Sequence, residues 1–130
     1  MLEKAQIVPS LPVVDLARAV KFYHEKLGLK VVQQDKPEVE WGGAVVEGAG
    51  GARIYLYKRG ATKADHTVLS FAVQDFDAVF KSLQDKGVKF EEYDMPGLKT
   101  VKGVAVLGGM KSAWFKDTEG NILGLSNMVV

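Results

Sequence analysis

Apolar residues spaced three or four positions apart mark two segments of this chain. After Asp15 they are Leu16, Ala19, Val20, Tyr23 and Leu27, and after Asp75 they are Phe76, Val79, Phe80 and Leu83. This spacing places the apolar side chains of each segment on one face of an amphipathic helix. Each aspartate is a good N-cap residue, and Gly28 and Gly87 suit the left-handed residue that ends a helix. The pattern predicts two helices, each covering one side of another element.

Shorter segments with alternating or continuous apolar residues predict strands around these helices. In the first half they span residues 6–13, 29–34, 39–47 and 52–58, and in the second half residues 66–73, 88–93, a broken 104–116, and 121–127. Turn-forming residues at 48–51 and 117–120 join strands directly to each other. The predicted order of elements is therefore βαβββ, twice.

The two halves also resemble each other in sequence. Residues 13–21 match residues 73–81, and each copy then reaches a glycine flanked by lysine and apolar residues. Such internal similarity indicates a repeated structural unit. Because 130 residues is the length of one domain, we expect a single domain with one module at 1–60 and a second at 61–130.

Composition excludes several classes of protein. Hydrophobic residues at 47% and charged residues at 25% are typical of a soluble globular chain. Its net charge of +1 leaves no basic footprint for nucleic acid, and no apolar run approaches the ~20 residues of a membrane span. The absence of cysteine excludes disulfides and thiolate chemistry, and the N-terminus has no signal-peptide pattern. We expect a cytoplasmic protein that binds neither nucleic acid nor membranes.

Two motifs carry a family resemblance that covers essentially the whole chain. One runs from residues 11–16 (LPVVDL) through Phe22-Tyr23 to residues 27–29 (LGL), and the other is WFKDTEGN at residues 114–121. Together with the paired βαβββ units they resemble the vicinal oxygen chelate superfamily, which includes glyoxalase I, extradiol dioxygenases and the bleomycin resistance proteins. The second motif is similar to the family's F-x-D-P-D-G-N turn, with Thr118 in place of proline. The resemblance implies an α+β fold in which two tandem βαβββ modules form a cup.

In the enzymes of that family a divalent metal lies in the cup and takes its ligands from four positions. The resemblance assigns these positions to Val8, Ile54, His66 and Gly124. Only the histidine can coordinate a metal, whereas catalytic metal sites generally use about three protein ligands. We therefore expect no metal and no cofactor in the cup.

Strand alternation independently predicts a cavity wall. One parity of residues 66–73 and 121–127 holds His66, Ser70, Gly124 and Ser126, while the other parity holds large apolar residues that should pack against the helices. A sheet face whose side chains are too small for dense packing and too apolar for exposure to solvent is typical of a ligand cavity. The predicted ligand-contacting residues are Trp114, Trp41, His66, Ser70, Ser112, Met110, Gly124 and Ser126.

Hairpin geometry brings the two tryptophans into this prediction. The turn at 117–121 sets Trp114 opposite Gly124, where the indole would form a stacking platform. The turn at 48–51 sets Val45 opposite Ile54, so that Trp41 also points inward, while Tyr55 and Tyr57 pack under a helix. For each tryptophan, simple filling of the core is the alternative. Residues 94–102 are predicted to be an irregular loop that could cover the cup, and Gly108-Gly109-Met110 to be a bulge.

Two functions follow, and the first is favoured. A metal-free, aromatic cup resembles the antibiotic-sequestering branch of the family, whose members commonly work as homodimers and bind a small, largely apolar or aromatic molecule. The alternative is an enzyme: a lyase, isomerase or dioxygenase-like protein with an altered metal site, or a metal-free catalyst with His66 as base. A base needs an orienting partner, and strand alternation turns Asp65 away from the cup. A structural or regulatory module is a third interpretation.

Overall fold

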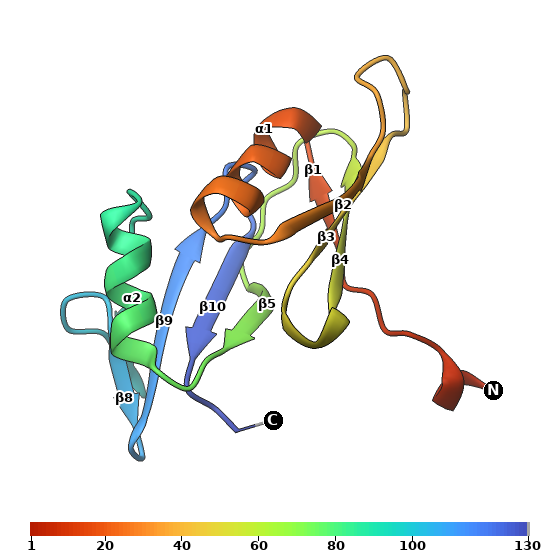
Figure 1. Cartoon of the computed structure of the whole chain (residues 1–130). Coiled ribbons are helices and arrows are strands. Elements are labelled where there is room, and N and C mark those ends of the chain that lie inside the picture. The colour runs from red at the N-terminus through yellow and green to blue at the C-terminus, as the bar shows by residue number, and fades with distance from the viewer. Residues whose placement is uncertain (130) are drawn as a thin grey trace. The chain divides into compact units, whose positions relative to one another are not determined.

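The computed structural model describes residues 1–129, which carry the two predicted βαβββ modules (Figure 1). The chain divides into two compact units, Met1–Thr62 and Lys63–Val130, and each is described by itself. Within residues 1–129 no helix has the length and apolar character needed to cross a bilayer.

The first unit is a four-stranded sheet with one helix. Its elements are η1 (Leu2–Lys4), β1 (Ser10–Val13), α1 (Leu16–Lys21), the π-helical turn η2 (Phe22–Lys26), β2 (Lys30–Gln34), β3 (Gly43–Glu47), η3 (Ala49–Gly51) and β4 (Arg53–Lys58). The strand order is β1-β4-β3-β2, with β1 parallel to β4 and the other pairs antiparallel. The predicted cap is confirmed, because the Asp15 carboxylate accepts a hydrogen bond from the Arg18 backbone N–H at 3.0 Å.

The core of the first unit lies between α1 and one face of the sheet. Its buried residues are Leu11, Val13, Leu16, Ala19, Val20, Tyr23, Ala44, Val46, Ile54 and Leu56. The helix residues are those of the predicted apolar stripe, and the strand residues alternate along β1, β3 and β4 as a half-buried sheet requires.

The predicted pairing of β3 with β4 is wrong by one residue. Val45 pairs with Tyr55, and Val46 with Ile54. The connecting loop is longer than residues 48–51, because the Gly48 N–H bonds the carbonyl of Ala52 at 2.9 Å and adds that residue to the turn. A slip of one residue exchanges the two faces of a strand.

The tyrosines of β4 therefore lie on the face opposite α1. Ile54 and Leu56 are buried, whereas Tyr55 and Tyr57 are half-buried and stack with ring centroids 6.3 Å apart. Glycine at residue 43 makes room for the Tyr55 ring, because a Cβ atom there would lie 2.6 Å from Cζ of Tyr55.

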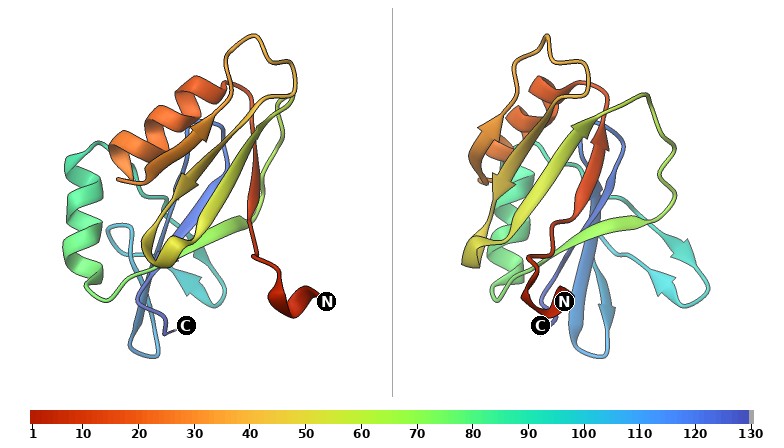
Figure 2. Two further views of the ribbon diagram at one scale, coloured as in Figure 1. Left: turned by 45° about the vertical axis from the view of Figure 1, so that its right-hand side comes forward. Right: turned by 90° about the vertical axis from the view of Figure 1, so that its right-hand side faces the viewer.

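The second unit repeats this topology. Its elements are β5 (Thr67–Ala72), α2 (Phe76–Asp85), β6 (Asp94–Met95), β7 (Leu98–Lys99), β8 (Ala105–Leu107), β9 (Met110–Lys116) and β10 (Ile122–Ser126). The main sheet has the order β5-β10-β9-β8, and β6 and β7 form a separate small hairpin (Figure 2). The two-module α+β fold is thereby confirmed.

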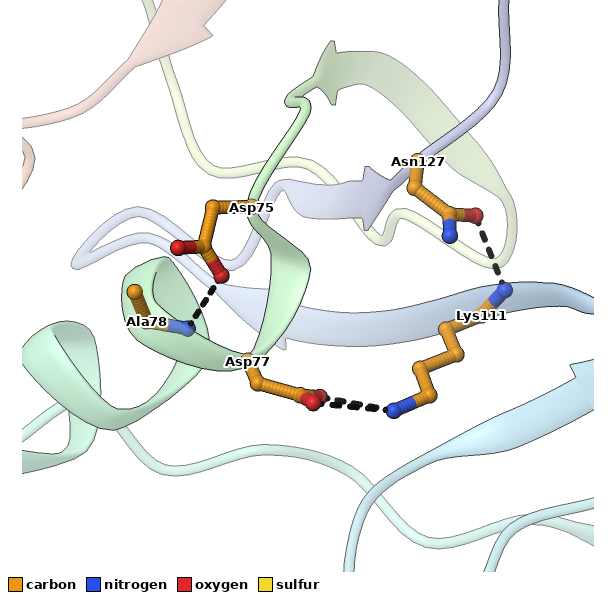
Figure 3. Close-up of polar contacts among 5 residues, drawn as sticks. All are labelled: Asp75, Asp77, Ala78, Lys111 and Asn127. Atoms are coloured by element: carbon orange, nitrogen blue, oxygen red, sulfur yellow. Dashed lines mark hydrogen bonds and ion pairs between the residues drawn. The ribbon is translucent and has the colours of Figure 1, made fainter.

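Polar contacts cap the N-terminus of helix α2 and link it through Lys111 to β9 (Figure 3). The Asp75 carboxylate accepts the Ala78 N–H at 3.2 Å, which confirms the second predicted cap. The Lys111 ammonium donates to the Asp77 carboxylate at 2.8 Å, and the Lys111 backbone N–H donates to Asn127 Oδ1 at 2.9 Å. These contacts tie the start of α2 to β9 and to the segment after β10.

Two predicted features of the second unit are wrong. Residues 88–93 form no named strand, although Phe90 makes one bridge to Phe115 of β9. Gly108 and Gly109 both have positive φ, 57° and 84°, and they form a tight turn between β8 and β9 instead of a bulge. The edge strand is therefore split: one part pairs near Phe115, and β8 resumes the pairing after the β6–β7 hairpin.

Candidate ligand-binding site of the second unit

The predicted small face of the second sheet is present. Gly124 pairs with Trp114 on one side, as predicted, and with Ser70 on the other. Ser126 similarly pairs with Ser112 and with Ala72. The spacing is tight, because a Cβ atom at residue 124 would lie only 2.6 Å from Ser70 Oγ. Glycine at this position allows β5 and β10 to carry their small residues side by side.

A pocket of about 270 Å³ lies at the start of β5. Its lining residues are Asp65, His66, Thr67, Tyr93, Met95, Leu98, Trp114 and Ile122. The structure thus brings together two of the predicted ligand residues, Trp114 and His66. The other wall of the pocket consists of Tyr93, from the predicted strand 88–93, and of Met95 and Leu98, from the segment that was expected to be an irregular loop.

That wall is an ordered hairpin and not a loose loop. The backbone N–H of Tyr93 donates to Thr100 Oγ1 at 2.8 Å, and the N–H of Thr100 donates to the Tyr93 carbonyl at 2.9 Å. The Glu91 N–H bonds the Trp114 carbonyl at 2.7 Å, which draws this segment across β9. The Tyr93 and Trp114 rings then meet edge to face, 5.5 Å between centroids.

A register shift explains why Thr67 also reaches the pocket. Ile122 pairs with Thr67, but Leu123 pairs with Leu69, so Val68 is left without a pairing position on β10. The bulge reverses the predicted parity at the beginning of β5. Accordingly, the Thr67 methyl group lies 3.5 Å from the position of a Cβ atom on Gly124.

The remaining predicted residues lie outside this pocket. Trp41 belongs to the first unit, in the turn before β3, and is 75% exposed. Met110 begins β9 after the Gly108-Gly109 turn, and Ser112 and Ser126 are buried further along the paired strands. Ser70 and Gly124 pair beside the pocket without lining it.

Asp65 and His66 form a hydrogen-bonded pair, contrary to the predicted orientation of Asp65. The Asp65 Oδ1 atom lies 2.8 Å from His66 Nδ1. Both residues precede β5, which begins at Thr67, so strand alternation does not set their directions. The hydrogen bond to His66, followed by the attraction of its charge, lowers the pKa of Asp65. An ionised carboxylate can only accept, so the neutral imidazole must carry its proton on Nδ1.

The pKa of Tyr93 is raised, first by burial and then by the negative charge of Glu91. The Tyr93 hydroxyl therefore stays protonated at neutral pH and remains a hydrogen-bond donor. With Thr67 and His66 it gives a mainly apolar pocket a few polar groups, which is the usual composition of a small-molecule site.

The family model of the Glyoxalase/Bleomycin resistance protein/Dioxygenase superfamily matches residues 5–125. The chain belongs to this superfamily. A solved member from Sphaerobacter thermophilus DSM 20745 has 20% identity and a TM-score of 0.74, over 97% of this chain and 98% of that one. At this identity the likeness shows the fold alone. No curated protein matches the chain in sequence.

Two solved structures from Streptomyces sp. CB03234 are somewhat more similar in sequence. TnmS3, an antibiotic binding protein, has 25% identity and a TM-score of 0.64, over 96% of both chains. A glyoxalase/bleomycin resistance protein has 26% identity and a TM-score of 0.64, over 93% of this chain and 98% of that one. Antibiotic-binding members are therefore among the structural neighbours of this chain.

The residues present do not fit the divalent metal that the superfamily implies. Ile54 is buried on the helix-facing side of β4, and the other face carries Tyr55 there. Residue 124 is a glycine and has no side chain to coordinate a metal, and the first carbon of a glutamate there would displace the Ser70 hydroxyl, 2.6 Å away. Among residues 1–129 no three His, Asp or Glu side chains gather in a group that could hold a metal ion.

Proposed function

We propose that this superfamily member binds a small, largely apolar or aromatic molecule against Trp114 and Tyr93, without a metal, and acts by sequestering it. The edge-to-face aromatic pair in the pocket carries this proposal. An indole that is half exposed beside a cavity can stack on a flat ligand, and a stacked aromatic contact adds to simple burial. The similarity to TnmS3, an antibiotic binding protein, supports a small-molecule ligand.

We also propose that the protein is a cytoplasmic homodimer. Strands β2 and β8 are edge strands, each hydrogen-bonded to one neighbouring strand. Val106 and Leu107 of β8 are exposed, and an apolar edge strand invites pairing with another chain. Two-fold dimers are the commonest oligomers of soluble chains, and pairing of such edges would form one.

The test of the binding proposal compares variants of Trp114, which lines the pocket, with variants of Trp41, which lies outside it. In a Trp41→Phe protein the Trp114 indole is the single tryptophan, so a flat apolar quencher such as 1-nitronaphthalene should quench it in a saturable way. In the full-length protein, Trp114→Ala should weaken binding measured by calorimetry by about 1–3 kcal/mol. Trp41→Ala is the matched control and should leave the affinity unchanged. Equal affinities of the Trp114→Ala protein and the parent would refute the assignment of this pocket.

The second candidate function is a metal-free enzyme. The observation that favours it is the hydrogen bond between Asp65 and His66 at the same pocket. The sequence argument against a histidine base depended on the lack of an orienting carboxylate, and the structure supplies one.

A further inference from the structure

One ring nitrogen of His66 is hydrogen-bonded within the protein, and the other is available to a ligand. Its Nδ1 atom is bound to Asp65, and no other residue of the described part of the chain hydrogen-bonds to its Nε2 atom. The imidazole side chain is 73% exposed at the rim of the pocket. A histidine held in this tautomer presents the Nε2 lone pair as a proton acceptor.

We propose that Asp65 and His66 form a general-base pair that removes a proton from a flat aromatic substrate held against Trp114. The proposal rests on the ligand binding of the proposed function, since the substrate must first occupy the pocket, and it puts turnover in place of sequestration. His66 is the catalytic residue, because its Nε2 atom would contact the reacting proton. Asp65 is a positioning residue that fixes the ring and stabilises the imidazolium once it forms.

The residues that line the pocket argue for the substrate class. The apolar walls of Met95, Leu98 and Ile122 suit an aromatic body, and Trp114 offers an edge or face for stacking. His66 lines the same pocket next to two polar residues that adjoin it in the sequence, Asp65 and Thr67. A substrate with an acidic C–H or O–H at one end of a flat ring system matches this division.

The probe for this activity is 5-nitrobenzisoxazole, a flat aromatic compound with one acidic C–H. His66 Nε2 would take the proton from C3, and the C–H electron pair would complete the C≡N bond. The N–O bond would break with its electrons on oxygen, which gives 2-cyano-4-nitrophenolate. The imidazolium then returns its proton to water, so the reaction needs no oxidant, reductant or second substrate.

Four full-length variants separate the roles of the residues. His66→Ala should lower kcat/KM at least ~100-fold, the lower end of the usual contribution of a positioned base. Asp65→Asn should lower kcat about tenfold while KM stays the same, because it disturbs the ring and not the pocket. Trp114→Ala should act mainly on KM. His24→Gln is the control for an ordinary surface imidazole, since His24 is the other histidine and bonds the Leu29 carbonyl instead.

Binding and turnover are measured on the same proteins. Quenching of Trp114 by 5-nitrobenzisoxazole, in the Trp41→Phe background, should give the same Kd with and without His66→Ala. Saturable quenching without any turnover that depends on His66 would overturn the base and leave the binding function standing. Absence of saturable quenching would overturn both. An equal loss in His24→Gln, or an Asp65→Asn effect confined to KM, would also overturn the inference.

Discussion

Gly124→Ala tests the close approach of β5 and β10 at the edge of the site. The new methyl group would lie 2.6 Å from Ser70 Oγ, 3.4 Å from Ser70 Cβ and 3.5 Å from Thr67 Cγ2. The last two distances are ordinary contacts, so the hydroxyl of Ser70 is the single atom that must move. The prediction is that the effect of alanine at 124 depends on the residue at 70.

Two opposing terms set the magnitude. Displacing Ser70 Oγ from its rotamer costs about 0.5–1.5 kcal/mol. Replacing glycine in extended backbone stabilises by about 0.4–1 kcal/mol, because the unfolded chain loses freedom. In the parent protein these terms nearly cancel, whereas in a Ser70→Ala background only the favourable term remains. The interaction free energy between the two substitutions should therefore be about 0.5–1.5 kcal/mol.

Urea unfolding of the parent, both single variants and the double variant measures this interaction directly. For a chain of this length the effect corresponds to a difference of about 2–6 °C in melting temperature. Ser70 is exposed, so Ser70→Ala alone should change stability by less than about 0.5 kcal/mol. An interaction free energy below about 0.3 kcal/mol, the usual error of additivity, would refute the proposed contact.

Three further predictions concern the metal, the assembly and the first sheet. Added nickel, zinc, iron or manganese should leave the melting temperature unchanged. A metal that bound the folded protein would instead stabilise it by ~4 kcal/mol at a thousandfold excess over its Kd. One bound equivalent with His66 as a ligand would contradict this prediction. Light scattering should give about 28 kDa, twice the 14.2 kDa of one chain, and a 14.2 kDa particle at tens of micromolar would contradict the dimer. Gly43→Ala should destabilise by about 1–3 kcal/mol in urea unfolding, since the Tyr55 ring must be displaced; unchanged stability would show that the ring moves freely.

The elements that the sequence predicts well are those with local signals. Both helices begin after the predicted aspartates, whose carboxylates accept the backbone N–H three residues on. Gly28 and Gly87 end them with positive φ, 77° and 89°. A cap, an apolar stripe and a left-handed glycine all depend on residues within a few positions of one another, so they can be read without knowing the tertiary structure.

Register was predictable only where the turn length was fixed. Residues 117–121 close a tight turn through the Asp117 carboxylate, which accepts the N–H groups of Glu119 and Asn121. This pins Trp114 opposite Gly124, as predicted. The turn after Glu47 carries glycines at 48, 50 and 51, which leave its length open by one residue. Because the turn is one residue longer than predicted, Ile54 lies on the helix side of the sheet, and Tyr55 and Tyr57 lie on the other face.

Strand alternation predicted only part of the site, because Asp65, His66 and Tyr93 of its wall lie outside the strands. Asp65 and His66 precede β5, and Thr67 lies at a bulge, where a period of two fails. The opposite wall is the β6–β7 hairpin, whose signal was available in Pro96-Gly97, a pair typical of a tight turn. Reading those two residues as a turn pairs Met95 with Leu98 and predicts an apolar ribbon beside Trp114.

The replacement of metal ligands and the presence of the aromatic pocket are parts of one arrangement. A glutamate at 124 would need the space that the Ser70 hydroxyl occupies, whereas glycine leaves that hydroxyl undisturbed between β5 and β10. Trp114 stands directly opposite that glycine and therefore meets no side chain across the ladder. Its indole is free to contact Tyr93, and the two rings form the wall of the pocket. The histidine at the position that the family resemblance assigns to a metal ligand is paired here with Asp65 through its Nδ1 atom.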